Sequence, residues 1–114
     1  MRSNLPLSAD RKITVIYRIE PGCLGPEGPE RIDDFCRYAQ QEVATIDTEY
    51  VNWNILPRLD KSIPEMQYML AGKRINHQQA DKYLKILGKN LDEFEGDLID
   101  IITVLIEQFF KRAP

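Results

Sequence analysis

The segment from Leu91 to Phe110 constrains the fold more than any other part of the chain, because it carries two apolar stripes at helical spacing. The first stripe consists of Leu91, Phe94, Leu98, Ile101, Leu105 and Phe109, and the second of Ile99, Ile102, Ile106 and Phe110. A helix with two apolar stripes needs cover on more than one side, since each large side chain is worth about 1.5–3 kcal/mol when buried. We therefore expect part of this helix to lie at a two-fold interface between two copies of the chain. The interface residues we expect are Leu98, Ile99, Ile102, Ile106 and Phe110.

The composition is that of one globular domain. The chain has 114 residues, of which 43% are hydrophobic and 29% are charged, and such a length suits a single core. The net charge of −3 makes nonspecific binding to nucleic acid or to an acidic membrane a poor expectation. We expect one domain over residues 11–114, preceded by a flexible tail over residues 1–10 that shows no periodicity.

No segment of the sequence indicates export or membrane insertion. The first residues lack the apolar run of a signal peptide, and no stretch approaches about 18 uninterrupted apolar residues. The two cysteines, Cys23 and Cys36, are not in Cys-x-x-Cys spacing and do not make a disulfide framework. We expect a cytoplasmic protein with two reduced thiols and no membrane partner, with a Cys23–Cys36 disulfide as the alternative.

The first half of the chain has the pattern strand, helix, strand. Residues 12–19 and 48–56 alternate apolar and polar side chains and are rich in β-branched and aromatic types, as strands are. Between them, residues 30–44 carry apolar side chains at steps of three and four, with Pro29 near the start, which predicts a helix.

The second half reads as three helices. The first covers about 63–71, with Pro64 in its first turn and Gly72 at its end. The second covers about 76–87 and the third about 91–111, with Asn76 and Asn90 as their N-caps. The fold class predicted is α+β, with a small two-stranded sheet followed by three helices. Because two strands are marginal alone and leave open edges, we expect a homodimer to complete or cover the sheet.

Residues 21–30 form a loop with three glycines and three prolines in ten positions. Long irregular loops are often functional, and a thiol near a helix N-terminus can become reactive. One alternative is therefore a small enzyme that uses this loop and Cys23. The loop matches neither of the glycine-rich phosphate-binding motifs, and its acidic residues oppose a thiolate. We therefore assign no catalytic residue.

Residues 58–90 carry seven basic residues and three acidic ones. The candidates for contact with DNA are Lys73, Arg74, Lys82 and Lys85. Residues 63–95 resemble the later half of a Cro/repressor-type helix-turn-helix domain, on the residues Gly72, Lys73, Arg74, Leu87, Gly88, Leu91, Asp92, Glu93 and Phe94. Pro57 and Asp60 depart from that pattern. The resemblance implies a diverged helix-turn-helix over residues 51–95 that binds duplex DNA.

Metal and cofactor chemistry is not predicted. His77 is the single histidine and stands at a helix start, where it is expected to be exposed. The acidic run Asp92–Asp100 matches no calcium-binding or di-iron motif and is expected to be a solvated helix face.

The function that these patterns favour is that of a small interaction or regulatory protein without catalytic activity, acting through a dimeric surface. A separate protein partner is compatible with this reading, and a nucleic-acid partner belongs to the helix-turn-helix alternative.

Overall fold

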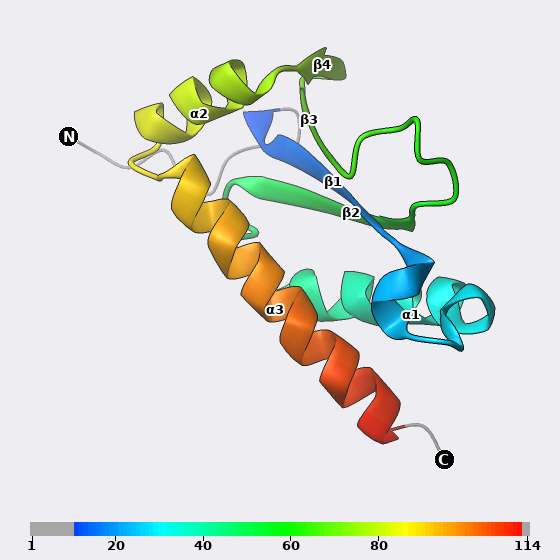
Figure 1. Ribbon diagram of the computed structural model, residues 1–114. Coiled ribbons are helices and arrows are strands. Elements are labelled where there is room, and N and C mark those ends of the chain that lie inside the picture. Colours follow the sequence, from blue (N-terminus) through cyan, green and yellow to red (C-terminus); the bar gives the residue numbers. More distant parts are fainter. Residues whose placement is uncertain (1–10, 113–114) are drawn as a thin grey trace. The chain divides into compact units, whose positions relative to one another are not determined.

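A computed structural model describes residues 11–112, and their element order is shown in Figure 1. The elements are β1 (Ile13–Ile19), the 3-10 helix η2 (Pro21–Leu24), α1 (Gly28–Val43), β2 (Val51–Pro57), β3 (Met66–Leu70), β4 (Lys73–Ile75), α2 (His77–Ile86) and α3 (Leu91–Arg112). The described part is thus a mixed α+β protein, as predicted. The tail predicted for residues 1–10 lies outside the described range. The chain divides into two compact units, Met1–Ile75 and Asn76–Pro114.

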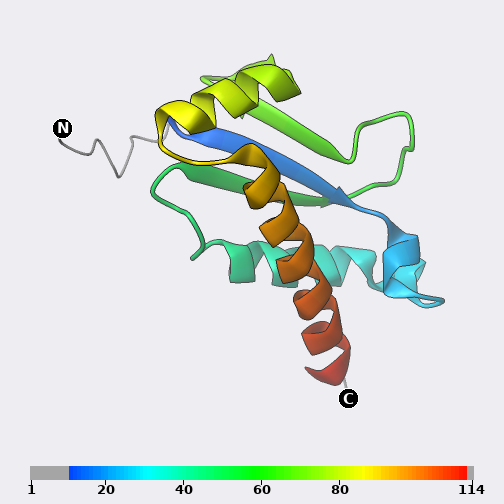
Figure 2. The same cartoon turned by 60° about the vertical axis from the view of Figure 1, so that its left-hand side comes forward.

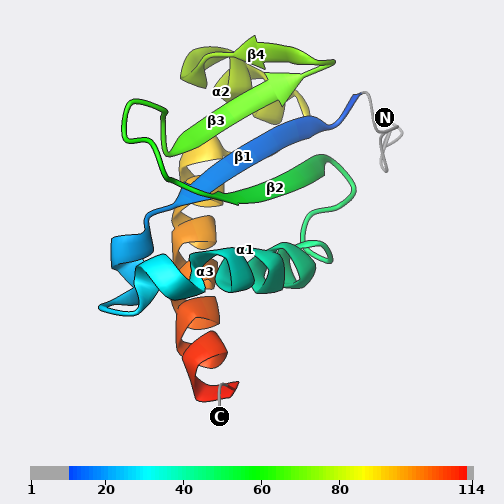
Figure 3. The same ribbon diagram turned by 90° about the vertical axis from the view of Figure 1, so that its right-hand side faces the viewer.

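The first unit contains a four-stranded sheet in the order β2-β1-β3-β4, which Figure 3 shows from one face. β1 and β2 are parallel, with Ile13 opposite Val51, and α1 connects them. β3 is antiparallel to β1, and β4 is antiparallel to β3. The predicted strands at 12–19 and 48–56 and the predicted helix at 30–44 are confirmed as β1, β2 and α1, with shifted ends.

The helix predicted over residues 63–71 is wrong, and so is the two-stranded sheet. Residues 66–75 form the β3–β4 hairpin, which turns at Ala71 and Gly72. Both turn residues have positive φ, at 53° and 78°, as in the two-residue turn whose twist matches paired strands. A glycine in such a turn looks in sequence like a glycine that ends a helix. Since β3 and β4 extend the sheet within one chain, the expected completion of the sheet by a second copy is not matched.

Both faces of the sheet carry buried residues, since Ile16 and Gln67 are buried on the face opposite to Val15. On one face of β1, Ile13, Val15 and Ile19 are at most 3% exposed. Because paired residues share a face, Val51 and Ile55 of β2 lie on the same side and are also buried. α1 runs beside β2 (Figure 2) and is amphipathic, and it buries Ile32, Phe35, Cys36, Ala39 and Val43.

The glycine-proline loop makes a tight turn from β1 into α1. η2 occupies its first part, and α1 begins at Gly28 rather than after Pro29. A Cβ atom at Gly28 would overlap the carbonyl oxygen of Pro21. Glycine is therefore required by the close approach of η2 to the start of α1.

The second unit consists of α2 and α3, and both predicted helices are confirmed. Asn76 caps α2 through a reciprocal capping box with Gln79, in which both hydrogen bonds are 2.8 Å long. Asn90 accepts a hydrogen bond of 3.0 Å from the backbone N–H of Glu93 and so caps α3. Gly88, with a φ of 78°, supplies the left-handed residue that ends α2.

Candidate interaction surfaces

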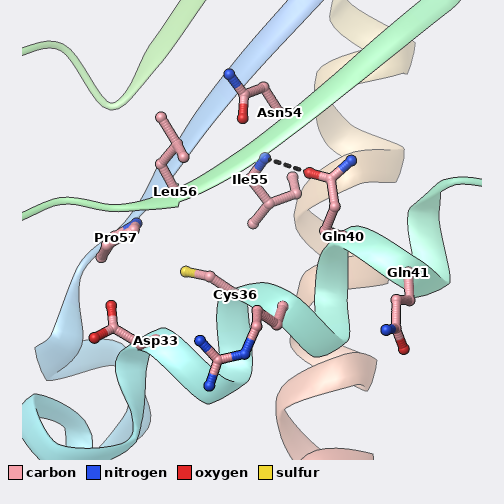
Figure 4. Close-up of a pocket in the computed structure, with 9 residues that line it drawn as sticks. Asp33, Cys36, Gln40, Gln41, Asn54, Ile55, Leu56 and Pro57 are labelled. Carbon is pink, nitrogen blue, oxygen red and sulfur yellow. Dashed lines mark hydrogen bonds between the residues drawn. The ribbon is translucent and has the colours of Figure 1, made fainter.

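A groove of about 470 Å³ lies between α1 and β2 (Figure 4). It is lined by Asp33, Cys36, Arg37, Gln40, Gln41, Asn54, Ile55, Leu56 and Pro57. The size would suit a small ligand. Its polar side chains decide whether it can also perform chemistry.

Both polar atoms of the Gln40 side chain form hydrogen bonds to the backbone of β2. Its Nε2 donates a hydrogen bond of 3.0 Å to the carbonyl oxygen of Trp53, and its Oε1 accepts one of 2.8 Å from the backbone N–H of Ile55. These backbone groups lie on the side of β2 that has no strand neighbour, since β2 is an edge strand. The Gln40 side chain therefore occupies backbone hydrogen-bonding groups that an additional strand would need for pairing with β2.

The environment of Cys36 disfavours its thiolate form. Burial, and then the carboxylate of Asp33, raise the pKa of Cys36 from 9.0 to about 12. The thiolate, which is the nucleophilic form, is therefore scarce at neutral pH. Arg37 lies next to it and pairs with Asp34 on its own helix. Beside the carboxylate of Asp33, the groove thus holds a protonated thiol, an engaged amide and a paired guanidinium, and the thiol is a poor nucleophile in this form.

A second structured feature is the loop from Arg58 to Glu65, which joins β2 to β3. The guanidinium of Arg58 donates to the carboxylate of Glu20 at 2.6 Å, to the carbonyl oxygen of Ile63 at 3.0 Å and to that of Lys61 at 3.1 Å. From the neighbouring strand, Arg18 donates to the carbonyl oxygen of Pro64 at 2.8 Å. No sequence motif predicts this role of Arg58, because its partners are two backbone carbonyls and a carboxylate 38 positions away.

This loop exposes apolar side chains to solvent, although the hydrogen bonds of Arg58 and Arg18 hold its backbone. Leu59 is 76% exposed and Ile63 is 37% exposed. Asp60 accepts hydrogen bonds from the backbone and the hydroxyl of Ser62, and these bonds lower the pKa of its carboxyl group. A rigid loop with exposed apolar residues can bind a partner at a small entropic cost.

Cys23 lies in η2 and is exposed and free. Close to it, Tyr17 has a pKa raised by burial, by Glu65 and by Cys23 itself. The phenol therefore keeps its proton and supplies no base. Tyr17 therefore cannot serve as the base that the enzyme alternative needs to activate Cys23.

The four basic candidates are exposed but are divided between the two units. Lys73 and Arg74 are neighbours in β4 and point to opposite faces of the sheet. Lys82 and Lys85 lie on α2, where Lys85 pairs with Asp81 at 3.0 Å. The helix-turn-helix interpretation of residues 51–95 is wrong, because residues 51–57, 66–70 and 73–75 are strands.

The predicted interface residues of α3 differ in exposure within a single chain. Leu98 and Ile102 are buried, at 1% and 5% exposed. Ile99 is 54% exposed, and Ile106 and Phe110 are half-buried. We call Ile99, Ile106 and Phe110 the outer stripe of α3.

Searches against family models, curated proteins and solved structures found no match to this chain. Over residues 11–112, no helix combines the length and the apolar character needed to span a bilayer.

Proposed function

We propose that the protein acts by binding rather than by catalysis, and that it works as a homodimer joined through the outer stripe of α3. The observation that carries this proposal is the exposure of Ile99, at 54%, on the same side of the helix as the half-buried Ile106 and Phe110. Their spacing of seven and four residues sets them along one line of an α-helix.

A second copy of the same helix suits this stripe. When two helices pair antiparallel about a two-fold axis, Ile99 of one copy comes near Phe110 of the other, and Ile106 lies near the axis. The stripe is therefore complementary to itself. Charged residues are absent from its three positions, so no unpaired charge would be buried at the contact.

The energies favour a weak dimer. Full burial of an Ile or Phe side chain is worth about 1.5–3 kcal/mol, and each of these side chains is already partly covered, so that six of them contribute on the order of 5–9 kcal/mol. Loss of translational and rotational freedom costs about 4–15 kcal/mol. The dimer should therefore form reversibly and depend on concentration.

Two further observations support a binding role. In the α1–β2 groove, Gln40 is engaged in hydrogen bonds to the backbone of β2, and the raised pKa of Cys36 keeps its thiol protonated. In addition, the braced loop from Arg58 to Glu65 offers Leu59 to solvent, so a dimer could present two copies of this loop to a protein partner. The free thiol of Cys23 is compatible with a reducing compartment and so with the cytoplasmic location that we propose.

Sedimentation equilibrium over a range of concentrations tests the dimer. We expect the wild-type chain to change from monomer to dimer as concentration rises, and Ile99→Glu with Ile106→Glu to keep it monomeric, because glutamates would be desolvated at the contact. Val104→Glu is the matched control, since Val104 is 50% exposed and lies on a different side of α3. A wild-type chain that stays monomeric at high concentration, or a dimer lost equally in all variants, would refute the proposal.

A further inference from the structure

In the second unit, His77 comes together with two members of the acidic run of α3, Asp92 and Glu95. The ring nitrogens of His77, at the start of α2, and the carboxylate oxygens of Asp92 and Glu95, in the first turns of α3, offer ligand atoms that all lie within 4.8 Å of one another. In the sequence, Asp92 stands fifteen positions after His77. Only the way that α2 leads into α3 creates the cluster.

The types of ligand atom are those of a transition-metal site. An imidazole nitrogen together with carboxylate oxygens suits zinc, whereas oxygen atoms alone suit calcium or magnesium. From these side chains we infer that His77, Asp92 and Glu95 form a binding site for a divalent transition-metal ion, with zinc as the ion that fits best. Water completes the coordination, because two of the three side chains are exposed.

The distance between the histidine and the glutamate supports a shared ion. Nε2 of His77 lies 3.6 Å from Oε1 of Glu95, which exceeds the usual hydrogen-bond length of about 2.7–3.2 Å. Two ligands of a tetrahedral zinc ion, each about 2.0–2.2 Å from the metal, are about 3.4 Å apart. The gap between these two atoms is therefore close to that of two ligands around one ion.

The backbone that carries the ligands is held in place. His77 follows Asn76, whose capping box with Gln79 fixes the first turn of α2. Asp92 and Glu95 are three residues apart and hence neighbours on one side of α3, whose first turn Asn90 caps. The ligand atom of Asp92 thus lies within 4.8 Å of those of His77 and Glu95 on a capped helix.

A bound ion would tie the start of α2 to the first turns of α3. Such a link adds stability to the folded second unit in proportion to the metal concentration. The site is therefore a means by which zinc availability could stabilise this part of the chain, independently of the dimer that the outer stripe of α3 forms.

Isothermal titration calorimetry with zinc chloride tests the site in the full chain. A Cys23→Ser background removes the exposed thiol as a competing ligand. We expect one zinc ion per chain, and at least about a tenfold loss of affinity in His77→Ala and in Glu95→Gln, since even the removal of an outer-shell partner of a metal ligand costs about 10–100-fold. Glu93→Gln is the matched control, because it removes a carboxylate from the same turn but not from the cluster.

The single histidine provides a direct second measurement. Its ring nitrogen resonances are the only imidazole signals of the chain, and zinc should shift them in proportion to occupancy. Circular dichroism of each variant verifies that the helices remain formed. No heat of binding together with an unshifted His77 signal at millimolar zinc would overturn the inference, and so would equal affinity in the wild type and in His77→Ala.

Discussion

The side-chain oxygen of Gln40 accepts a hydrogen bond of 2.8 Å from the backbone N–H of Ile55, fifteen residues further along the chain. The same amide donates to the carbonyl oxygen of Trp53. α1 is therefore attached to the open edge of β2 by one side chain that imitates the hydrogen-bonding groups of a strand. Pro57, at the end of β2, has no N–H to offer to a neighbour. This edge of the sheet is protected within the chain.

Replacing Gln40 with alanine should lower the free energy of unfolding by about 1–3 kcal/mol, because two partly buried backbone groups lose their partners. It should also raise the tendency to aggregate, because the edge of β2 becomes available for pairing. Urea unfolding and light scattering measure the two effects. Gln41→Ala is the control, since Gln41 is exposed, and an equal effect of both substitutions would contradict the role given to Gln40.

Arg58 should matter more for local order than for overall stability. Arg58→Met removes hydrogen bonds to Glu20, Ile63 and Lys61, and we expect a loss of about 1–2 kcal/mol because the pair with Glu20 is partly exposed. Amide hydrogen exchange should then accelerate in residues 58–65 before it does in β1. Lys61→Ala provides a comparison, since Lys61 contributes its backbone carbonyl to this network. Unchanged exchange in Arg58→Met would show that the loop is held by other contacts.

Much of the fold follows from local patterns in the sequence. The predicted α1, α2 and α3 are confirmed because periodicity and caps such as Asn76 act within a few residues. The β3–β4 hairpin was missed because its turn, Ala71–Gly72, lacks the asparagine or aspartate that usually marks such a turn. In the sequence, Pro64 and Gly72 also stand at positions typical of the first turn and the end of a helix.

The candidate sites were harder to predict than the elements. The hydrogen bonds from Gln40 to β2 join residues thirteen and fifteen positions apart, and the cluster brings His77 to acidic residues at least fifteen positions further along the chain. Such pairs depend on how elements pack, and no spacing rule along one helix or strand reveals them. Helical spacing predicts the second stripe of α3, but only the burial of Ile102 in the structure separates the outer stripe from it.

The two cysteines should differ sharply in reactivity. Cys23 is exposed, whereas burial and Asp33 raise the pKa of Cys36 to about 12. We expect a thiol reagent at pH 8 to label one cysteine per native chain and both in denaturant, as mass spectrometry can count. Because the folded pKa of Cys36 exceeds its ordinary value of 9.0, the stability that depends on it is complete below pH 9 and declines as pH rises toward 12. Rapid native labelling of Cys36 would refute the burial assigned to it.

Gly28 should tolerate no side chain. In Gly28→Ala the new methyl group would overlap the carbonyl oxygen of Pro21, and since backbone must move to make room, we expect a loss of about 1–3 kcal/mol or more. Gly22→Ala is the control, because no atom lies within 4 Å of a Cβ atom built there. Thermal unfolding compares the two. Equal midpoints would mean that η2 does not approach α1 as closely as described.

Ala71 offers a way to stabilise the protein. It has a φ of 53°, a left-handed conformation that costs an ordinary L-residue about 1–2 kcal/mol and that asparagine adopts more readily. Ala71→Asn creates the Asn-Gly pair that this hairpin turn prefers, so we expect a gain of about 0.5–1 kcal/mol and a rise in Tm of about 2–5 °C. Ala44→Asn is the matched control, since Ala44 is exposed and has a φ of −61°, where asparagine has no such advantage. A fall in Tm for Ala71→Asn, or the same rise for Ala44→Asn, would show that the turn at residues 71–72 does not limit the stability of the hairpin.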